Sequence, residues 1–549
     1  MGGAVARGGA GLTAPARAGS GHRTAVGVAA AVVLGFLGLF FAWPVAAILG
    51  LGAGGGVTGV LADPATWRLV AFTLGQAAGS TLLALLAGMP LAYVLARVAI
   101  PGKAVLRAMI MVPFVLPTLV VGMAFRALLG GADGVSVLGI MLANGFFNVA
   151  VVARTVGGLW THLDRRVEDT ARSLGASRLR AFTSVTLPAL LPALGSALAV
   201  VFLFCSTSFG VVLVLGGGQY RTLETEIYLR TVQLLDLRGA AALSLLQLAA
   251  VVASLVIAAL ARRRRETALR LRKAEETARP PQGGEWWVVG AAGVVVAALA
   301  TPVVSLLLRS VSTRDGWSLA GYRALAGTGE RGTLQVSGID AALNSVRTAA
   351  DATWLSLLIG LLASFVLIGV QRRTTAEVLD TVLMLPLGVS AVTVGFGYLV
   401  TLDALPGDLR TSPLLVPFAQ ALVVTPLVIR MVLPVLRSID TRLRQAAATL
   451  GANPWRVRWE IDVPLAARAV VAAAGFGFVV ALGEFGATSF LARPDTPTLP
   501  VAIGRLVSRP GELNSQMAYA ACALLMIVTI VAVIAIERVR GRTESVGEF

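Results

Sequence analysis

Charged residues are scarce in this chain of 549 residues, of which only 14% are Asp, Glu, Lys or Arg. A water-soluble globular protein keeps about a quarter of its residues charged, so the composition excludes an ordinary soluble globule. Histidine and cysteine are scarcer, with two residues of each. His22 and His162 leave almost no material for a histidine metal site or a catalytic triad. Cys205 and Cys522 lie inside apolar runs, which argues against a disulfide framework or a zinc site.

Motifs of enzymatic chemistry are also lacking. The sequence contains no H-E-x-x-H, no G-x-S-x-G and no clustered carboxylates, so nothing supports a membrane-embedded enzyme. It has no Walker A loop, because the nearest string, GTGERGT at 327–333, lacks the lysine that would reach a phosphate. We therefore expect a chain with no catalytic residues, no metal site and no cofactor of its own.

Long hydrophobic runs are what the sequence does contain, and the mean hydropathy is +0.81. Runs of about 20 residues are long enough to cross the hydrocarbon core of a bilayer as helices. Only helices or closed barrels satisfy the backbone in lipid, and these runs lack the alternation of barrel strands. The sequence predicts an all-α integral membrane protein with about twelve transmembrane helices. We place them at 24–52, 69–96, 104–129, 135–159, 189–215, 239–261, 286–308, 344–370, 376–402, 412–436, 466–491 and 516–537.

The net charge of +17 would suggest a nucleic-acid partner in a soluble protein. Here the basic clusters follow the second, fourth, sixth, eighth and last predicted spans, the longest being RRRRETALRLRK at 262–273. All of them fall on one side of a twelve-span arrangement, and the positive-inside rule makes that side cytoplasmic. We therefore expect membrane lipid around the chain, no nucleic acid, and both termini in the cytoplasm.

Two polar stretches interrupt the apolar pattern and resemble each other. The first polar loop is EDTARSLGASRLRAFTSVTLP (Glu168–Pro188), and the second polar loop is RQAAATLGANPWRVRWEIDVP (Arg444–Pro464). A register kept over such a distance predicts a tandem duplication with about six helices in each half. An even number of spans gives both halves the same orientation in the membrane. One offset of 276 residues relates Gly175 to Gly451, Pro188 to Pro464 and Phe209 to Phe485.

In both loops the local residue pattern predicts a helix, a break and a second helix. Gly175 and Gly451 supply the left-handed position that ends the first helix. Ser177 and Asn453 then cap a short second helix, and a proline follows where a membrane helix begins. Two equivalent amphipathic elements on one side of the membrane predict a two-fold partner, whereas either copy alone is also typical of an interfacial helix lying on lipid.

The pattern of an acidic residue, two alanines, three residues, a glycine and a Leu-Pro thirteen residues later resembles the EAA loop of type I ABC importer permeases. In that family the loop is the coupling helix that fits a groove on the ATP-binding subunit. The family's glutamate is Asp169 in one copy and the uncharged Gln445 in the other, so an ion pair from this position is expected to be weaker or absent in the second half. The resemblance assigns coupling to the ATPase to Asp169, Ala171, Gly175, Pro188, Gln445, Ala447, Gly451 and Pro464.

The resemblance also implies a domain organisation and partners. It implies the membrane-spanning permease subunit of an importer in a bacterial inner membrane, which is not itself an enzyme. Two copies of a separate subunit would bind and hydrolyse ATP, and an extracytoplasmic binding protein would deliver a small substrate. The expected segments are a cytoplasmic start (1–23), an anchor helix and outer loop (24–68), the first type-1 permease domain (69–260), a cytoplasmic linker (262–285), a seventh helix and outer loop (286–341), the second type-1 permease domain (342–537) and a cytoplasmic tail (538–549).

The fusion of two halves in one chain is similar to the ferric-iron and thiamine importer permeases, so ferric iron or thiamine is the expected cargo. An ABC permease for another solute, such as an inorganic anion or a polyamine, stays open as an alternative. A secondary transporter of the major-facilitator type also has two parallel six-span halves. The polar element here lies between spans four and five of each half, which does not fit the major-facilitator pattern.

One acidic residue, Glu484, lies near the middle of a predicted span, where a charge costs at least about 2.5–3.5 kcal/mol. Such residues usually face a bundle interior or a water-filled path. Thr488 follows one helical turn later, and Ser208, beside Ser206, holds the equivalent position in the first half. We expect Ser206, Ser208, Glu484 and Thr488 to line the translocation pathway; the alternative is that Glu484 only packs helices together.

Overall fold

The chain is almost entirely helical. Within the part of the chain that the structure describes, the only strands are β1 (Ser312–Thr313) and β2 (Gly316–Trp317), which have two residues each and pair antiparallel. This computed structural model describes residues 20–53, 56–130, 136–263, 279–313, 316–370, 372–401 and 412–544.

The first half runs from α1 to α13, and these bounds fix the labels used below. Its helices are α1 (Ser20–Leu37), the π-helical turn η1 (Gly38–Ala42), α2 (Trp43–Ala53), α3 (Gly56–Ala62), α4 (Pro64–Arg97), α5 (Lys103–Val115), α6 (Thr118–Leu128), α7 (Val137–His162), α8 (Arg165–Ser173), α9 (Arg178–Ala181), the π-helical turn η3 (Phe182–Thr186), α10 (Leu187–Ser206), α11 (Gly210–Leu215), α12 (Leu223–Val232) and α13 (Leu237–Arg263).

The second half repeats this order from α14 to α25. Its helices are α14 (Glu285–Val311), α15 (Ala320–Ala324), the 3-10 turn η5 (Glu330–Gly332), α16 (Gly338–Gly369), α17 (Arg373–Met384), the 3-10 turn η6 (Leu385–Gly388), α18 (Ala391–Thr401), α19 (Leu415–Ser438), α20 (Thr441–Thr449), α21 (Pro454–Val457), the π-helical turn η8 (Arg458–Asp462), α22 (Val463–Gly483), α23 (Thr488–Leu491), α24 (Leu499–Ser508) and α25 (Glu512–Glu544).

Ten helices of the described chain are long and apolar enough to cross a membrane, and two bent pairs bring the number to twelve. The pair α5 and α6 bends by 101°, and the pair formed by α17 with η6 and α18 bends by 92°. The spans predicted at 104–129 and 376–402 are therefore broken rather than straight. In the first pair Leu116 precedes Pro117 and is extended, because a proline ring disfavours the helical conformation of the residue before it.

Two further predicted spans are interrupted near their ends. The span predicted at 189–215 divides into α10 and α11, and the span predicted at 466–491 divides into α22 and α23. The prediction that Glu484 lies within a continuous helix is thus wrong, because α22 ends at Gly483 and Glu484 has an extended backbone (φ −67°, ψ 126°). The residue belongs to the break and not to the helix.

Equivalent contacts hold each half together. The helix α4 packs along α7, and α16 packs along α19 in the same manner. Gly88 and Gly360 permit these close approaches, because an added Cβ would lie 2.6 Å from a valine carbon of the facing helix in both cases. The backbone N–H of Leu223 donates to the Thr73 hydroxyl at 3.0 Å, and that of Leu499 donates to the Ser345 hydroxyl at 2.6 Å. These matched contacts confirm the internal duplication.

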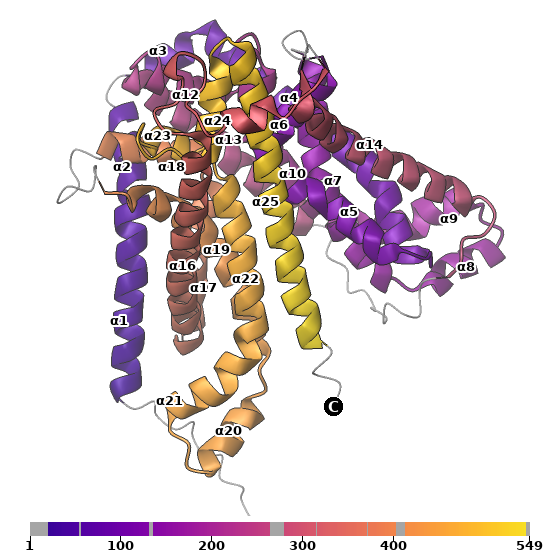
Figure 1. Cartoon of the computed structure of the whole chain (residues 1–549). Coiled ribbons are helices and arrows are strands. Elements are labelled where there is room, and N and C mark those ends of the chain that lie inside the picture. The colour runs from indigo at the N-terminus through magenta and orange to yellow at the C-terminus, as the bar shows by residue number, and fades with distance from the viewer. Residues whose placement is uncertain are drawn as a thin grey trace, which may run out of the picture.

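The first helix of each half packs against the other half. The helix α1 lies along α16, and Phe40 of η1 stacks on Phe418 of α19 with ring centroids 4.6 Å apart. Reciprocally, α14 packs against α4, α5 and α6 of the first half, and also against α25 (Figure 1). Each half therefore completes its helix packing with a helix that belongs to the other half.

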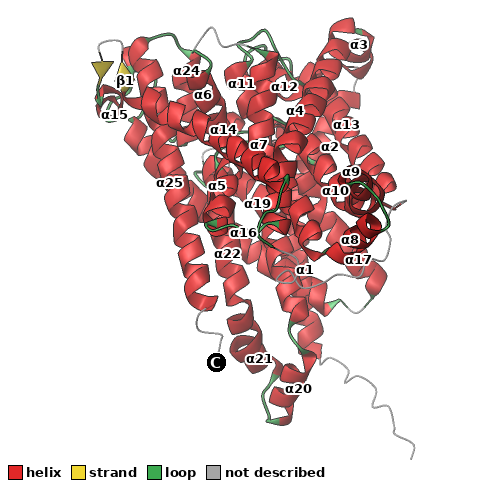
Figure 2. Cartoon of the chain, turned by 90° about the vertical axis from the view of Figure 1, so that its right-hand side faces the viewer, coloured by secondary structure: helices red, strands yellow, loops and turns green. Residues whose placement is uncertain are grey.

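The two polar loops lie at separate ends of the molecule. Figure 1 shows α8 and α9 at the end of the right-hand arm and α20 and α21 at the bottom, whereas α12, α24 and α18 gather toward the top. Figure 2, turned by 90°, again places α20 and α21 at the bottom and α12 and α24 at the top. The halves are joined near the top and diverge toward the two loops.

Candidate functional site

The predicted break in each polar loop is confirmed. Gly175 has φ +91° and Gly451 has φ +85°, which is the left-handed conformation that glycine adopts without strain. In the first loop, the N–H of Ala176 donates to the Ala171 carbonyl at 3.1 Å, and the N–H of Gly175 donates to the Arg172 carbonyl at 3.0 Å. This pair of bonds is the Schellman cap, and it satisfies carbonyls at the end of α8.

The second loop has the same cap. The N–H of Ala452 donates to the Ala447 carbonyl and the N–H of Gly451 to the Ala448 carbonyl, both at 3.0 Å. Ala171 and Ala447, two of the residues predicted to couple, thus hold equivalent places in the two caps. The bonds require their backbone carbonyls and not their side chains.

The caps of the second short helices are also as predicted. The Ser177 hydroxyl accepts from the N–H of Arg180 at 3.3 Å, and the Asn453 side chain accepts from the N–H of Arg456 at 2.7 Å. The expectation that a separate membrane helix begins at the proline is wrong. The helix α9 runs through the π turn η3 into α10, and Pro188 follows that turn. Because proline has no N–H to donate, the widened turn accommodates it without a break in the helix.

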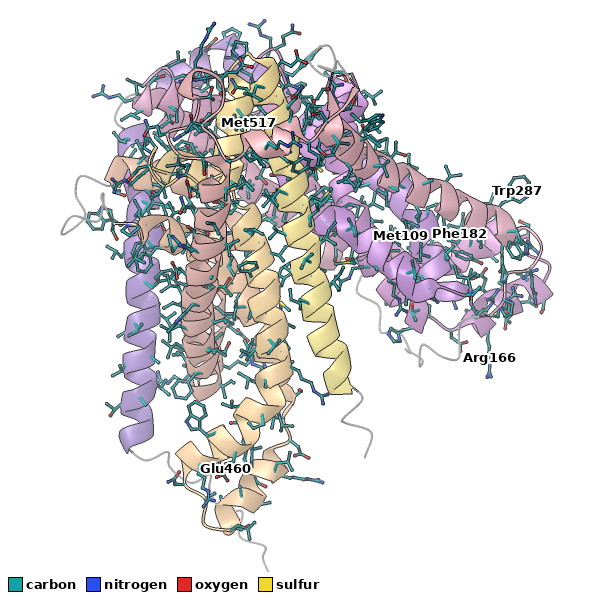
Figure 3. The ribbon with its side chains drawn as sticks, viewed as in Figure 1. Met109, Arg166, Phe182, Trp287, Glu460 and Met517 are labelled. Carbon is teal, nitrogen blue, oxygen red and sulfur yellow. The ribbon has the colours of Figure 1, made fainter. Side chains whose placement is uncertain are left out.

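The tip of each loop presents an exposed leucine. Leu174 and Leu450 stand immediately before the left-handed glycines, and they are 85% and 88% exposed. Asp169 and Gln445 are exposed on the adjoining helices, and Asp169 lies 3.9 Å from Arg172. Both loops therefore expose an apolar tip beside a polar helix. Figure 3 marks Arg166 and Phe182 on one arm and Glu460 on the other.

Sequence reasoning missed a side-chain contact between the start and the end of each polar loop. In the first loop the Thr186 hydroxyl donates to the Glu168 carboxylate at 2.9 Å. In the second loop the equivalent positions hold Arg444 and Asp462, which form an ion pair at 2.8 Å. The offset of 276 residues relates both positions, so aligning the loops could have revealed this contact although its chemistry differs.

The first polar loop is additionally tied to the start of the second half. Glu285, the first residue of α14, forms ion pairs with Arg165 at 3.0 Å and Arg279 at 3.1 Å, and it accepts from the Tyr93 hydroxyl at 3.0 Å. The backbone N–H of Arg279 donates to the carbonyl of Arg97, the last residue of α4, and the Arg279 carbonyl accepts from the N–H of Ala99. The end of the linker therefore holds the first loop against the body of the protein.

The predicted pathway residues of the second half lie together. The buried carboxylate of Glu484 accepts from the N–H of Ala487 at 2.7 Å and the N–H of Thr488 at 3.0 Å, and also from the Thr488 hydroxyl. Gln420 of α19 donates to the same hydroxyl at 3.3 Å. The carboxylate thus satisfies the N–H groups at the start of α23 and links that short helix to α19.

The equivalent site of the first half is a chain of amides. Ser208 donates to Asn144 at 2.7 Å, Asn144 donates to Gln76 at 3.1 Å, and Gln76 donates to the Cys205 carbonyl at 2.7 Å. Ser206 instead donates to a carbonyl of its own helix at 2.9 Å, so it stays outside this chain of contacts. Sequence reasoning missed the amides, although Asn144 is the residue that the repeat places on Gln420 of the second half.

Aromatic rings from both halves meet where the halves contact each other, and we call this contact the aromatic seam. Phe209 and Phe485, which are repeat equivalents, stack with centroids 5.2 Å apart and planes inclined by 17°. Tyr228 of α12 contacts Phe209 at 5.2 Å and Phe490 at 5.4 Å. Repeat-equivalent residues in contact lie on the pseudo-two-fold axis. Ser208 and Glu484 precede the two stacked residues and therefore flank that axis.

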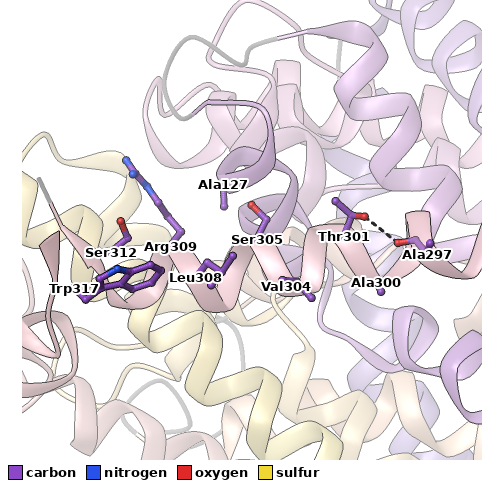
Figure 4. A pocket seen from close by; sticks show the side chains of 10 residues that line it. All are labelled: Ala127, Ala297, Ala300, Thr301, Val304, Ser305, Leu308, Arg309, Ser312 and Trp317. Carbon is purple, nitrogen blue, oxygen red and sulfur yellow. Dashed lines mark hydrogen bonds between the residues drawn. The ribbon is translucent and has the colours of Figure 1, made fainter.

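Two open grooves lie away from this seam. One, of about 540 Å³, follows α14 from Ala297 to Arg309 and ends at Trp317 (Figure 4). The other, of about 850 Å³, lies between α16, α22 and α25. Neither groove is lined by a predicted pathway residue. Among the described residues, no three His, Cys, Asp or Glu side chains group together as metal ligands would.

Comparison with known proteins defines the class. Residues 84–266 and 356–542 each match the family described as "Binding-protein-dependent transport system inner membrane component". The two matches cover more than half of the chain, and the chain belongs to this family. It is a multi-pass permease of the ABC importer type, built from two copies of the family domain. The family is one of transport permeases and not of enzymes.

Among its relatives, thiamine permeases match along most of the chain. The thiamine transport system permease protein ThiP of Escherichia coli is 25% identical over 500 residues, which cover 87% of this chain and 90% of the relative. ThiP of Brucella abortus is 25% identical over 513 residues, covering 89% and 90%. The molybdate/tungstate permease WtpB of Thermococcus kodakarensis is 34% identical over 154 residues, covering 28% of this chain and 62% of the relative.

Proposed function

We propose that this protein is the translocation subunit of an importer for thiamine. The similarity to thiamine permeases, which spans both halves and 87% or more of the chain, carries this assignment. The match to the molybdate/tungstate permease covers 28% of the chain, so it supports an anion as cargo less strongly. No relative reported above transports ferric iron, and that cargo is retained as a rival to be tested.

The partners follow from the two polar loops. Two copies of an ATPase dock there, with Leu174 and Leu450 entering a groove on each copy. Gly175 and Gly451 hold the leucines at the tips, and Pro188 and Pro464 lie where each loop joins its membrane helix. ATP is bound and hydrolysed in these partners, and this chain supplies no group to it. A fully buried leucine contributes about 1.5–3 kcal/mol, so each tip adds to the affinity for the copy that it contacts.

The import step is a rocking of the two halves. In the structure the halves meet at Phe209 and Phe485, while the loops stand apart (Figure 1). We assign the loops, the linker and both termini to the cytoplasm, so this arrangement corresponds to a pathway closed toward the outside. ATP-driven approach of the two ATPases would draw the loops together and part the aromatic seam. Rocking of two repeats around a central site is a general route to alternating access.

The binding protein meets the opposite end, where α12 and α24 lie (Figure 2). Cargo released there passes the seam and reaches the polar groups beside the axis. Ser208, Glu484 and Thr488 are the proposed contacts, and Ser206 adds a hydroxyl at the end of α10. A carboxylate beside the axis suits a cation such as thiamine better than an oxyanion.

Uptake in cells tests the cargo. A strain of the source organism that lacks this gene should lose uptake of labelled thiamine at nanomolar concentration, and the plasmid-borne gene should restore it. Ferric iron and molybdate uptake are measured in the same strain. Normal thiamine uptake together with lost iron or molybdate uptake would refute the assignment to thiamine and would identify the rival cargo.

A further inference from the structure

A carboxyl group of the first half is buried against the second half at the aromatic seam. Glu224 of α12 is fully buried, and its carboxyl accepts from the Ser390 hydroxyl at 3.0 Å and from the Gln247 amide at 3.2 Å. Ser390 belongs to the second half and caps α18 by accepting from the N–H of Thr393 at 3.0 Å. One hydrogen bond thus joins a carboxyl of α12 to the start of a helix across the seam.

Glu224 has no counterpart in the repeat. The offset of 276 residues places Pro500 at the position of Glu224. Upstream, an offset of 273 aligns MVPFVLP (111–117) with MLPLGVS (384–390) and so places Pro117 at the position of Ser390. Two proline side chains form no hydrogen bond. The buried carboxyl is therefore not a shared feature of the two repeats, because the second half folds without a counterpart of Glu224.

The surroundings of Glu224 are those of a site for an organic cation. Tyr228 lies one helical turn further along α12 and contacts Phe209 and Phe490, so an aromatic cluster adjoins this part of α12. Aromatic faces and carboxylates both attract cations. The Gln247 carbonyl oxygen is buried, and it has no partner in the described structure. The groups at this point are rich in acceptors, which suits a cargo that is positively charged or donates hydrogen bonds.

Glu224 is buried while the aromatic seam is closed, and it meets water when the seam opens. Burial raises the pKa of its carboxyl to about 8, and the hydrogen bond from Ser390 opposes part of this rise. Its polar neighbours Gln247 and Ser390 are both uncharged. Burial without a neighbouring positive charge thus favours the protonated form of the carboxyl while the seam is closed. Parting the halves removes Ser390, admits water and returns the carboxyl to its ionised form.

We infer that Glu224 is a specificity-determining residue that is exposed as a carboxylate when the two halves part and that then attracts an organic cation into the pathway. The inference rests on the proposed function, because it names the charge of the cargo. It adds a residue of α12 to the sites predicted beside the axis.

Transport by the complete complex with its ATPase and binding protein, reconstituted in liposomes, tests the inference. Glu224→Gln keeps an acceptor for Ser390 but removes the charge, and thiamine import per ATP hydrolysed should fall about tenfold, the factor that about 1.4 kcal/mol produces. Glu224→Asp should retain at least half of the wild-type import. Glu226→Gln, a matched control on the same helix whose carboxylate pairs with Arg221 and Arg230, should stay within about twofold.

Wild-type import by Glu224→Gln overturns the inference, and so does an equal loss in Glu224→Asp, since the charge would then be irrelevant. A second measurement is independent of the cargo. In a chain lacking Cys205 and Cys522, Glu224→Cys should react with a cationic thiol reagent when ATP and vanadate trap the closed ATPases, and not without nucleotide. Absence of labelling in the trapped state overturns the inference even where thiamine is imported. A wild-type complex that imports no thiamine refutes the proposed function, while the labelling still decides whether Glu224 becomes exposed.

Discussion

Phe209 and Phe485 stack face to face although 276 residues separate them in the sequence, with ring centroids 5.2 Å apart. Each follows the end of a long membrane helix, α10 or α22, and each precedes a short one, α11 or α23. Because the two residues are repeat equivalents, their contact is made once, on the axis. This aromatic pair therefore joins the two halves directly on the axis.

Removing one ring of this pair should loosen the closed state. An aromatic pair contributes about 0.5–1.5 kcal/mol beyond its buried area, so Phe209→Ala and Phe485→Ala should each raise ATP hydrolysis in the absence of cargo several-fold. Phe114→Ala is the matched control, because Phe114 pairs with Phe147 within one half at 5.5 Å. An equal increase in the control variant would show that the effect is general destabilisation and not loss of the seam.

The leucine tips should carry much of the affinity for the ATPase. Leu174→Asp and Leu450→Asp each place a charge in the proposed groove and should weaken association by about 2 kcal/mol, as loss of an interface hot spot does. Co-purification and a titration with the ATPase measure the loss.

Replacing the left-handed glycines, as in Gly175→Glu and Gly451→Glu, should misplace the tips and lower transport without preventing membrane insertion. Transport at the wild-type rate in both glycine variants would contradict the coupling role.

The two loops should respond unequally to loss of the residue at the family's acidic position. Asp169 is charged and Gln445 is not, so Asp169→Asn should weaken docking more than Gln445→Ala. An exposed ion pair contributes only about 0.2–1 kcal/mol, and the expected difference is correspondingly small. Binding of the isolated ATPase at two salt concentrations reveals it, since screening should erase the difference. Equal losses at low salt would show that the charge does not organise the interface.

Substitutions of Glu484 separate its contacts from its charge. Glu484→Ala leaves the N–H groups of Ala487 and Thr488 without their acceptor, so we expect a loss of about 1–3 kcal/mol in stability. Glu484→Gln retains an acceptor oxygen and should fold normally. Thiamine transport by Glu484→Gln should nevertheless fall, while the loaded binding protein still stimulates ATP hydrolysis. A well-folded Glu484→Gln complex with wild-type transport would leave packing as the role of Glu484.

Labelling of single cysteines tests the proposed orientation. Both native cysteines are buried, which favours their replacement by alanine as a background. A cysteine at Ser177, exposed in the first polar loop, should react only with reagent that has access to the cytoplasm. A cysteine at Gln219, exposed in the loop before α12, should react from the outside. Labelling of the Ser177 position from the outside would invert the assigned topology.

Features set by a few neighbouring residues could be predicted from the sequence. The left-handed Gly175 and Gly451 and the caps at Ser177 and Asn453 depend on local chemistry, and all four are present as expected. The hydropathy also located the spans. It did not reveal their breaks, because a helix and a broken helix with the same apolar residues have the same hydropathy.

Contacts across the molecule could not be predicted. The sequence does not indicate that α1 packs on the second half, because a lipid tail and an apolar helix are similar surroundings for an apolar face. Glu224 lies between the spans predicted at 189–215 and 239–261, where a carboxylate needs no explanation. Only the fold shows that Ser390, 166 residues later, covers it.

The first helix of each half packs against the other half, and this arrangement affects how the protein folds during its synthesis. The helix α1 leaves the ribosome early, yet α16, on which it packs, begins only at Gly338. During most of synthesis α1 must rest against lipid or the insertion machinery, and the first half cannot complete its packing alone. Joining both halves in one chain supplies the missing surface at a high effective concentration and in a one-to-one ratio. Two separate half-size chains would have to find each other in the bilayer before either could finish folding.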